Sequence, residues 1–204
     1  MENYDTTWKL DPVRGTATLA KPSDKLKNFA VQLHPILGCV GVAPPAGQSI
    51  ITSDLGAYGG NLDDPDLREG TTLFLPVFQR GALLYIGDAH AEQGFGELTG
   101  QGLETSMEVE FSVDLIEGES LGQPRAEDND YVMVSGISSS MTDAFQSATT
   151  GMARWLADTY HLNSTEVAMV VSTSMSYDIA EVVDPQVHIV AKIRKDVLNQ
   201  IPRP

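Results

Sequence analysis

The segment 87–97, with the sequence GDAHAEQGFGE, concentrates side chains that can bind a metal ion or transfer a proton. Asp88 and His90 are two residues apart, so on a β-strand both would point from the same face. The two glycines that follow allow a sharp turn, which would return the carboxyl group of Glu97 towards the same point. Such a cluster suits a divalent metal ion or an acid/base pair. The alternative is a solvated, hydrogen-bonded Asp-x-His pair at a strand edge.

A second polar cluster lies upstream in the segment 58–70, YGGNLDDPDLREG. Its paired glycines permit an unusual backbone turn that presents Asn61 and Asp63. The oxygen atoms of both side chains could accept hydrogen bonds from a substrate amide or coordinate a hard cation. The alternative is an Asx turn, in which both side chains bond only to neighbouring backbone amides.

The segment 34–47, HPILGCVGVAPPAG, offers a histidine and the chain's single cysteine. The following proline restricts His34, which is interpreted either as a substrate contact or as a structural or exposed residue. Cys39 sits in an apolar run with no histidine near it in the sequence, which indicates a buried inert thiol rather than a nucleophile. A G-x-S-x-G elbow, a phosphate-binding loop and a dinucleotide fingerprint are all absent from the sequence.

Short apolar runs between glycines and prolines predict strands at residues 36–42, 72–78, 82–86 and 107–116. The alternation is clearest from 107 to 115, where apolar residues at odd positions alternate with glutamate, serine and aspartate, so this strand should have one wet face. The runs 73–78 and 82–86 are apolar on both faces. They predict strands that are covered on both sides or buried in a subunit contact.

The spacing of apolar residues changes to three and four from about residue 142, which predicts a helix to His161. A second helix should begin at Asn163, which can form a capping box with Glu166, and should run to about Val183. Residues 186–193 then alternate and predict a last strand before a short terminal helix.

This order of elements predicts a mainly β (α+β) fold, a jelly-roll-like β-sandwich with an appended C-terminal helix pair. We expect one domain over residues 1–204, strand-rich in 1–135 and helical with a last strand in 136–204. The acidic stretch 117–130 should be an exposed loop between the two parts.

The net charge of the chain bears on which classes of binding partner it can have. Lys and Arg number 13 and Asp and Glu number 28, which gives a net charge of -15 and repels polyphosphate backbones. No apolar run approaches the roughly 18 residues of a membrane span, and the acidic N-terminal segment is unlike a signal peptide. We therefore expect no nucleic-acid partner, no membrane partner and a cytoplasmic location. A single cysteine also excludes an internal disulfide.

Several segments together resemble the core of the acetamidase/formamidase family, which hydrolyses short amides to a carboxylate and ammonia. They are HPILGCVGVAPP, GGNLDDPDL, EGTTLFLPVFQRGALLYIGDAHAEQGFGE and GLETSMEVEFSVDLI. The helical segment MARWLADTYHLNSTEVAMVVSTSMSYDIAEVVDP resembles the family's C-terminal part. The resemblance implies a jelly-roll-like core and a homo-oligomer.

Carried over by position, the family's GD-x-H motif falls on Asp88 and His90, and its glutamate after the glycine turn falls on Glu97. Its GGN-x-D motif falls on Asn61 and Asp63. Two departures stand out. Phe95 occupies the position between the two glycines where the family carries an acidic residue, and members of the family are longer at the N-terminus.

The leading hypothesis is metal-assisted hydrolysis of a small amide of the formamide or acetamide type. A divalent ion, zinc or alternatively calcium, would be held by Asp88, His90 and a third oxygen ligand and would activate a water molecule. Glu97 would act as the base, and the metal or Asn61 would polarise the amide carbonyl. The remaining assignments are catalytic for Glu97, Asn61 and Asp63 and substrate-binding for Gly60 and His34. The alternatives are a non-catalytic small-ligand-binding module, a pseudoenzyme subunit of the same fold, and a hydrolase of larger or cyclic amides.

Overall fold

The computed structural model describes residues 6–119 and 121–204. Within these ranges the chain is mostly β-structure, arranged in three antiparallel sheets, with three α-helices in the C-terminal part. The sheet orders are β1-β2-β3, β5-β6-β4-β8 and β11-β12-β10-β9-β7. The predicted class, mainly β with appended C-terminal helices, is therefore confirmed at this level.

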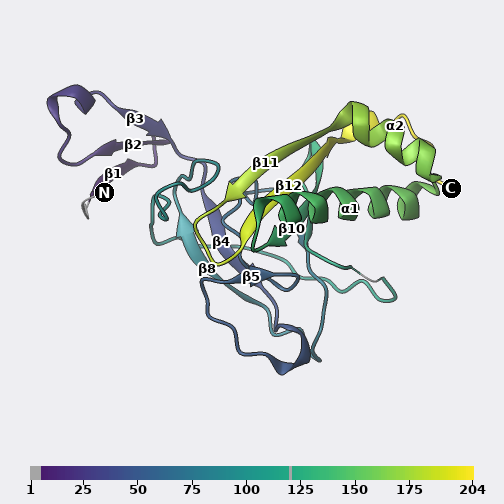
Figure 1. Ribbon diagram of the computed structural model, residues 1–204. Coiled ribbons are helices and arrows are strands. Elements are labelled where there is room, and N and C mark those ends of the chain that lie inside the picture. The colour runs from purple at the N-terminus through teal and green to yellow at the C-terminus, as the bar shows by residue number, and fades with distance from the viewer. Residues whose placement is uncertain (1–5, 120) are drawn as a thin grey trace.

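The N-terminal sheet stands apart from the rest of the molecule (Figure 1). It consists of β1 (Trp8–Asp11), β2 (Thr16–Leu19) and β3 (Ala30–Gln32), with a short 3-10 turn η1 (Asp24–Leu26) between the last two. Ala17 of β2 packs against Ala91 and Leu103, which lie on either side of the glycine turn that carries Glu97. The sequence pattern predicts no strand here, because the three strands are short and pair only with one another.

The central sheet carries the chemistry and consists of β4 (Ile36–Gly41), β5 (Leu55–Gly56), β6 (Gly59–Asn61) and β8 (Tyr85–His90). A second 3-10 turn, η2 (Pro45–Gly47), follows β4. β4 lies between β6 and β8, so that Cys39 faces Asn61 on one side and Ile36 faces His90 on the other. The strand predicted at 36–42 is β4. The strand predicted at 82–86 begins only at Tyr85, because the chain is still turning through positive φ before it.

The largest sheet consists of β7 (Thr72–Phe74), β9 (Arg125–Glu127), β10 (Tyr131–Ser138), β11 (Met175–Glu181) and β12 (Val187–Arg194). Helix α1 (Met141–Tyr160) runs along β10 and β12 (Figure 1). It buries Met152 and Leu156 completely in the main core. Gly136 permits this close approach, since a Cβ there would overlap the backbone of the helix.

The two long helices begin close to the predicted residues. Ser140 caps α1, and Asn163 caps α2 (Ser164–Ser174) in a capping box with Glu166. The short terminal helix is α3 (Lys195–Leu198). The predicted end of the second helix at Val183 is wrong: the chain after Ser174 forms β11, because its residues find a ladder of hydrogen bonds with β12 that the local sequence does not reveal.

Three further predictions need correction. Residues 107–116 form no strand, because no neighbouring segment in the described part of the chain pairs with them. The strand predicted at 72–78 ends at Phe74, two residues before Pro76, which lacks a backbone donor. The loop predicted at 117–130 contains β9, and its residue Ser120 lies outside the described residues, as do residues 1–5.

The apolar runs near β7 and β8 are not covered by residues 6–119 or 121–204, since Val77, Leu83 and Leu84 are exposed. Burial of this region in a subunit contact stays a prediction. In the described ranges, no α-helix combines the length and the apolar character that crossing a bilayer requires.

Candidate functional site

A cavity of about 610 Å³ opens between the central sheet and the turn that follows β11. One histidine, His90, lies in its wall beside five acidic side chains. These are Asp63, Asp88, Glu97, Glu104 and Asp184. Carboxylates crowded around one imidazole repel one another, so the group requires protons or a cation for stability.

His90 closes β8 and is only 1% exposed. Its Nδ1 lies 2.7 Å from Oε1 of Gln93, whose Nε2 in turn donates to the backbone carbonyl of Asp63 at 2.6 Å. Because the side-chain nitrogen of Gln93 is used in this way, Oε1 of Gln93 must accept, and Nδ1 of His90 carries the hydrogen. The other ring nitrogen, Nε2, then faces the cavity.

Two carboxyl groups meet that nitrogen. Nε2 of His90 lies 3.3 Å from Oδ1 of Asp88 and 3.1 Å from Oε1 of Glu104. Burial alone lowers the pKa of His90, but its contacts with Asp88, Gln93 and Glu104 outweigh burial and raise the pKa above the ordinary value. A neutral ring would direct a lone pair at two carboxylates. The geometry therefore calls for a proton or a metal ion at Nε2.

Asp63 is held by the turn after β6 with a φ of 39°, in the left-handed region. Its Oδ2 accepts from Nδ2 of Asn61, while its buried Oδ1 has no hydrogen-bond partner among the described residues. Burial, reinforced by the charge of Glu97, raises the pKa of Asp63. A buried carboxylate oxygen without a partner is costly, which is the condition that a bound cation would relieve.

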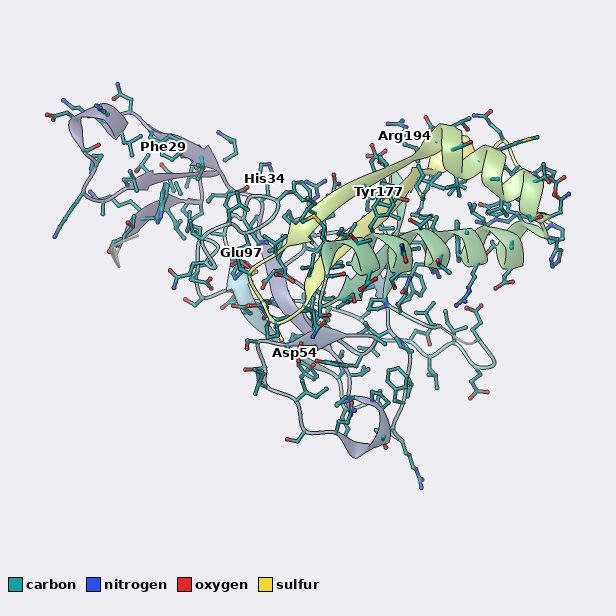
Figure 2. All side chains as sticks on the ribbon, viewed as in Figure 1. Phe29, His34, Asp54, Glu97, Tyr177 and Arg194 are labelled. Atoms are coloured by element: carbon teal, nitrogen blue, oxygen red, sulfur yellow. The ribbon has the colours of Figure 1, made fainter. Side chains whose placement is uncertain are left out.

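Glu97 reaches the cavity because its turn is docked on β11. The backbone N–H of Gly96, at a φ of 90°, donates to the carbonyl of Ala180 at 2.8 Å, and Val182 donates back to Gly96 at 3.2 Å. Figure 2 shows Glu97 in this central region between β8 and the end of β11. Burial raises the pKa of Glu97. The prediction that Glu97 returns to the neighbourhood of Asp88 and His90 is confirmed, since all three line the same cavity.

Two residues that line the cavity, Asp184 and Glu104, were not predicted from the sequence. The sequence pattern indicates only that Asp184 ends a helix. In the structure, its carboxylate accepts a hydrogen bond from Nδ2 of Asn61 at 2.8 Å, and its backbone N–H donates to the carboxylate of the buried Glu181 at 3.1 Å. Glu104 stands opposite His90 as an isolated bridge to β8. No local pattern marks either residue, because both reach the cavity through long-range pairing.

Two glycines lie directly against these side chains. A Cβ at Gly38 would overlap Oδ1 of Asp63 and lie 2.8 Å from Oδ2 of Asp88. A Cβ at Gly102 would lie 2.5 Å from Nδ1 of His90. Any larger residue at either position would displace a cavity side chain.

Two overlapping sets of side chains could hold a metal ion. Asp63, Asp88 and His90 form one set, and His90, Glu97 and Glu104 form the other. Within each set the potential ligand atoms lie within 4.8 Å of one another. One imidazole nitrogen with several carboxylate oxygens suits zinc, and the predominance of oxygen also suits calcium. The unpartnered Oδ1 of Asp63 fits either ion.

The structure places two predicted substrate-binding residues outside the cavity lining. Gly60, at a φ of 107°, packs its backbone against Asp54 and against Leu55 of β5, where a side chain would collide. His34 is exposed and pairs with Glu92 at 2.7 Å; Figure 2 shows it in the link between the N-terminal sheet and the rest. Cys39 does line the cavity, but burial, followed by the charge of Asp88, raises the pKa of its thiol to about 11.

Comparisons with known proteins show which proteins share the sequence and fold of this chain. A model of the acetamidase/formamidase family matches residues 41–200. The acetamidase of Mycolicibacterium smegmatis is 43% identical over 61 residues, which is 29% of this chain and 15% of that protein. A solved structure described as a predicted acetamidase/formamidase from Thermoanaerobacter tengcongensis has a TM-score of 0.83 at 28% identity, covering 90% of this chain and 60% of that one. The acetamidase of Yersinia enterocolitica has a TM-score of 0.83 at 28% identity, covering 94% and 55%.

The chain therefore corresponds to little more than half the length of these two solved relatives. The matched residues 41–200 include His90 and all five acidic side chains of the cavity. Most of the chain is thus described by one family model, and its fold agrees with two solved relatives. The chain belongs to the acetamidase/formamidase family.

Proposed function

We propose that this chain hydrolyses a small amide of the formamide or acetamide type to a carboxylate and ammonia, in the cavity around His90. One observation carries the proposal: Nε2 of His90, with its lone pair directed into the cavity, meets carboxyl oxygens of Asp88 and Glu104 within 3.3 Å. A set of one buried imidazole nitrogen and nearby carboxylate oxygens is the kind that binds a divalent ion in hydrolases.

Asp88 and His90 would hold this ion, with Glu104 or the unpartnered Oδ1 of Asp63 as the further ligand. A divalent ion, zinc or calcium, supplies Lewis acidity and lowers the pKa of a bound water molecule. The hydrogen on Nδ1 of His90, directed at Gln93, fixes the ring orientation and keeps Nε2 facing the cavity.

Glu97 is the proposed base. Burial raises the pKa of its carboxyl group towards neutral pH. A base with such a pKa can both take a proton and return it. Glu97 takes a proton from the attacking water and delivers it to the departing nitrogen, so that amide and water give a carboxylic acid and ammonia. The acid then passes its proton to ammonia, which leaves as ammonium, and the carboxylate remains.

Of the two roles considered for Asn61, polarising the amide carbonyl and accepting from the substrate amide, its contacts favour the second. Both hydrogens of its Nδ2 are used, by Asp63 and by Asp184, so the side chain has no donor left for a substrate carbonyl. Its Oδ1 remains, and we assign it to accept from the N–H of the substrate amide. Asp63 and Asp184 orient Asn61 for this contact.

Phe95 does not weaken the proposal. Its side chain is exposed and does not line the cavity, so the aromatic residue at this position removes no group from the metal-binding sets. The jelly-roll core, the homo-oligomer and the cytoplasmic location inferred from the sequence belong to the same proposal. The exposed apolar runs beside β8 support the homo-oligomer.

The test measures ammonia release from formamide, acetamide and a panel of larger and cyclic amides, together with the metal content of the purified protein. We expect turnover of the small amides, loss on chelation, recovery with added metal, and a loss of at least about a hundredfold in Glu97→Gln. The exposed Glu69→Gln is the matched control and should retain activity. Full activity in a metal-free preparation would remove the metal from the mechanism. Ligand binding without turnover of any amide would instead favour the non-catalytic module.

A further inference from the structure

A second cavity, of about 540 Å³, lies along helix α1, and among the described residues it shares no lining residue with the cavity around His90. Its walls come from the segment 121–125, from Val134 of β10 and from one face of α1, whose lining residues recur at three- and four-residue spacing. Two of the lining residues, Arg125 and Arg154, carry guanidinium groups. The described lining of the His90 cavity contains neither lysine nor arginine, so the two cavities differ in the charge of ligand that they suit.

Arg125, the first residue of β9, has hydrogen-bonding capacity that the protein does not use. Its guanidinium lies over the ring of Phe74, 3.9 Å from the centroid, and 5.7 Å from the centroid of Trp155. Its Nε is buried and has no hydrogen-bond partner among the described residues. Within residues 6–119 and 121–204 its one ion pair joins Nη1 to Oε1 of Glu127 at 4.0 Å. A buried donor without an acceptor costs free energy, which a ligand with acceptor oxygens would recover.

The charge of Arg125 is also only partly compensated. Burial lowers the pKa of its guanidinium, and the carboxylates of Glu127 and Glu119 oppose that effect without reversing it. A buried cation is stabilised by a closely paired anion. The two oxygens of a carboxylate match the fork of neighbouring N–H groups on a guanidinium, so a carboxylate is the anion that fits this group best.

Gln123 and Ser147 form a fixed polar part of the cavity wall. Nε2 of Gln123 donates to the carbonyl of Ser147 at 3.0 Å, and Oγ of Ser147 donates to Oε1 of Gln123 at 2.7 Å. Gly151 makes room for this pair, since a Cβ there would overlap Nε2 of Gln123. The pair joins the segment before β9 to α1, so both walls are in place before a ligand enters.

The remaining lining residues narrow the class of anion. Asp143 and Asp158 are exposed and also line the cavity, which opposes a dianion such as phosphate more than a monoanion. The indole of Trp155 offers a planar apolar surface in the same wall. We propose that this cavity binds an organic monocarboxylate with a planar apolar body, whose carboxylate pairs with Arg125 and is drawn in by the charge of Arg154.

The test is an NMR titration of the full chain with benzoate, acetate and inorganic phosphate. A chelator is present, so that no carboxylate binds through a metal ion at His90. We expect one saturable benzoate site with a dissociation constant of about 1 mM or tighter. The Nε–H signal of Arg125 should move downfield, because this group gains an acceptor. Acetate should bind more weakly, since it lacks the planar body, and phosphate more weakly than benzoate.

Two variants locate the site. Arg125→Lys keeps the positive charge but loses the fork of donors, and it should weaken benzoate binding by at least about tenfold. Arg154→Gln changes an exposed residue and should weaken binding by at least about threefold without disturbing the core. Arg14→Gln is the matched control: its side chain is 80% exposed in the N-terminal part, and the variant should bind benzoate as the wild type does. Urea unfolding checks that each variant is folded.

The inference is overturned if benzoate shows no saturable binding up to about 10 mM, which would leave a free energy too small for a built site. It is equally overturned if the Arg125 signal does not move, if phosphate binds more tightly than benzoate, or if Arg154→Gln binds as the wild type does. Should Arg125→Lys not fold, the wild-type signal and Arg154→Gln decide. Because no turnover is measured, the result is independent of whether the cavity around His90 hydrolyses an amide.

Discussion

Acidification should destabilise this protein through His188, which ties the largest sheet to the cavity. The ring is fully buried: Nδ1–H donates to the carbonyl of Leu62 at 2.7 Å, and Nε2 accepts from the hydroxyl of Ser135 at 2.9 Å. Leu62 lies between Asn61 and Asp63, so this bond anchors the turn that carries both. Burial lowers the pKa of His188 from 6.5 to about 4.

The folded protein keeps the His188 ring neutral, whereas the unfolded chain binds a proton below the ordinary pKa. The contribution of His188 to stability is therefore complete above pH 6.5 and is lost progressively as the pH falls towards 4. The full loss corresponds to about 3 kcal/mol of unfolding free energy.

The assay is urea unfolding of the wild type and of His188→Asn between about pH 4 and pH 7. Asparagine can keep a donor and an acceptor here but does not titrate. The comparison is needed because burial raises the pKa of Asp64 and of Glu181 to about 7, so these two carboxyl groups favour folding as the pH falls. The difference between wild type and variant isolates the histidine.

His161→Asn is the matched control. His161 is exposed at the end of α1 in the left-handed region, which asparagine tolerates, and its replacement should leave the pH profile of the wild type unchanged. Parallel profiles for the wild type and His188→Asn would refute the reasoning, since the buried ring would then contribute nothing to the pH dependence.

Three further predictions concern the cavity. Gly102→Ala should displace His90 and reduce both metal affinity and amide turnover by at least about tenfold. Gly94→Ala is the control and should change neither, because a Cβ at Gly94 meets nothing within 4 Å. Equal effects in the two variants would contradict this prediction. Because the pKa values of His90 and Asp63 are raised, metal binding at neutral pH should release protons and weaken as the pH falls. Calorimetric titration in buffers of different ionisation enthalpy checks this, and identical heats would refute it. Asp184→Asn should lower kcat/KM by at least about tenfold, because Asn61 loses a charged partner. The variant should keep its stability in urea, because burial already disfavours the charged form of Asp184 and raises its pKa. An unchanged kcat/KM would show that Asp184 does not orient Asn61.

The sequence alone determined the features that depend on local spacing and local caps. The stripe of apolar residues defined α1, and the Asn163–Glu166 box defined the start of α2. The two-residue spacing of Asp88 and His90, after an apolar run, predicted their shared face, and their oxygen and nitrogen atoms do meet at 3.3 Å. These interactions span a few residues, so their signal is present in any short window of sequence.

Only the tertiary structure decided the features that depend on a distant partner. The chain after Ser174 follows a strand path because β12 pairs with it, and residues 107–116 have the pattern of a strand but no partner in the described chain. Asp184 and Glu104 join the cavity through the same kind of long-range pairing, one by the turn after β11 and the other by its bridge to His90. A strand gains its hydrogen bonds from another segment, so neither its existence nor the convergence of its side chains can be derived from its own residues.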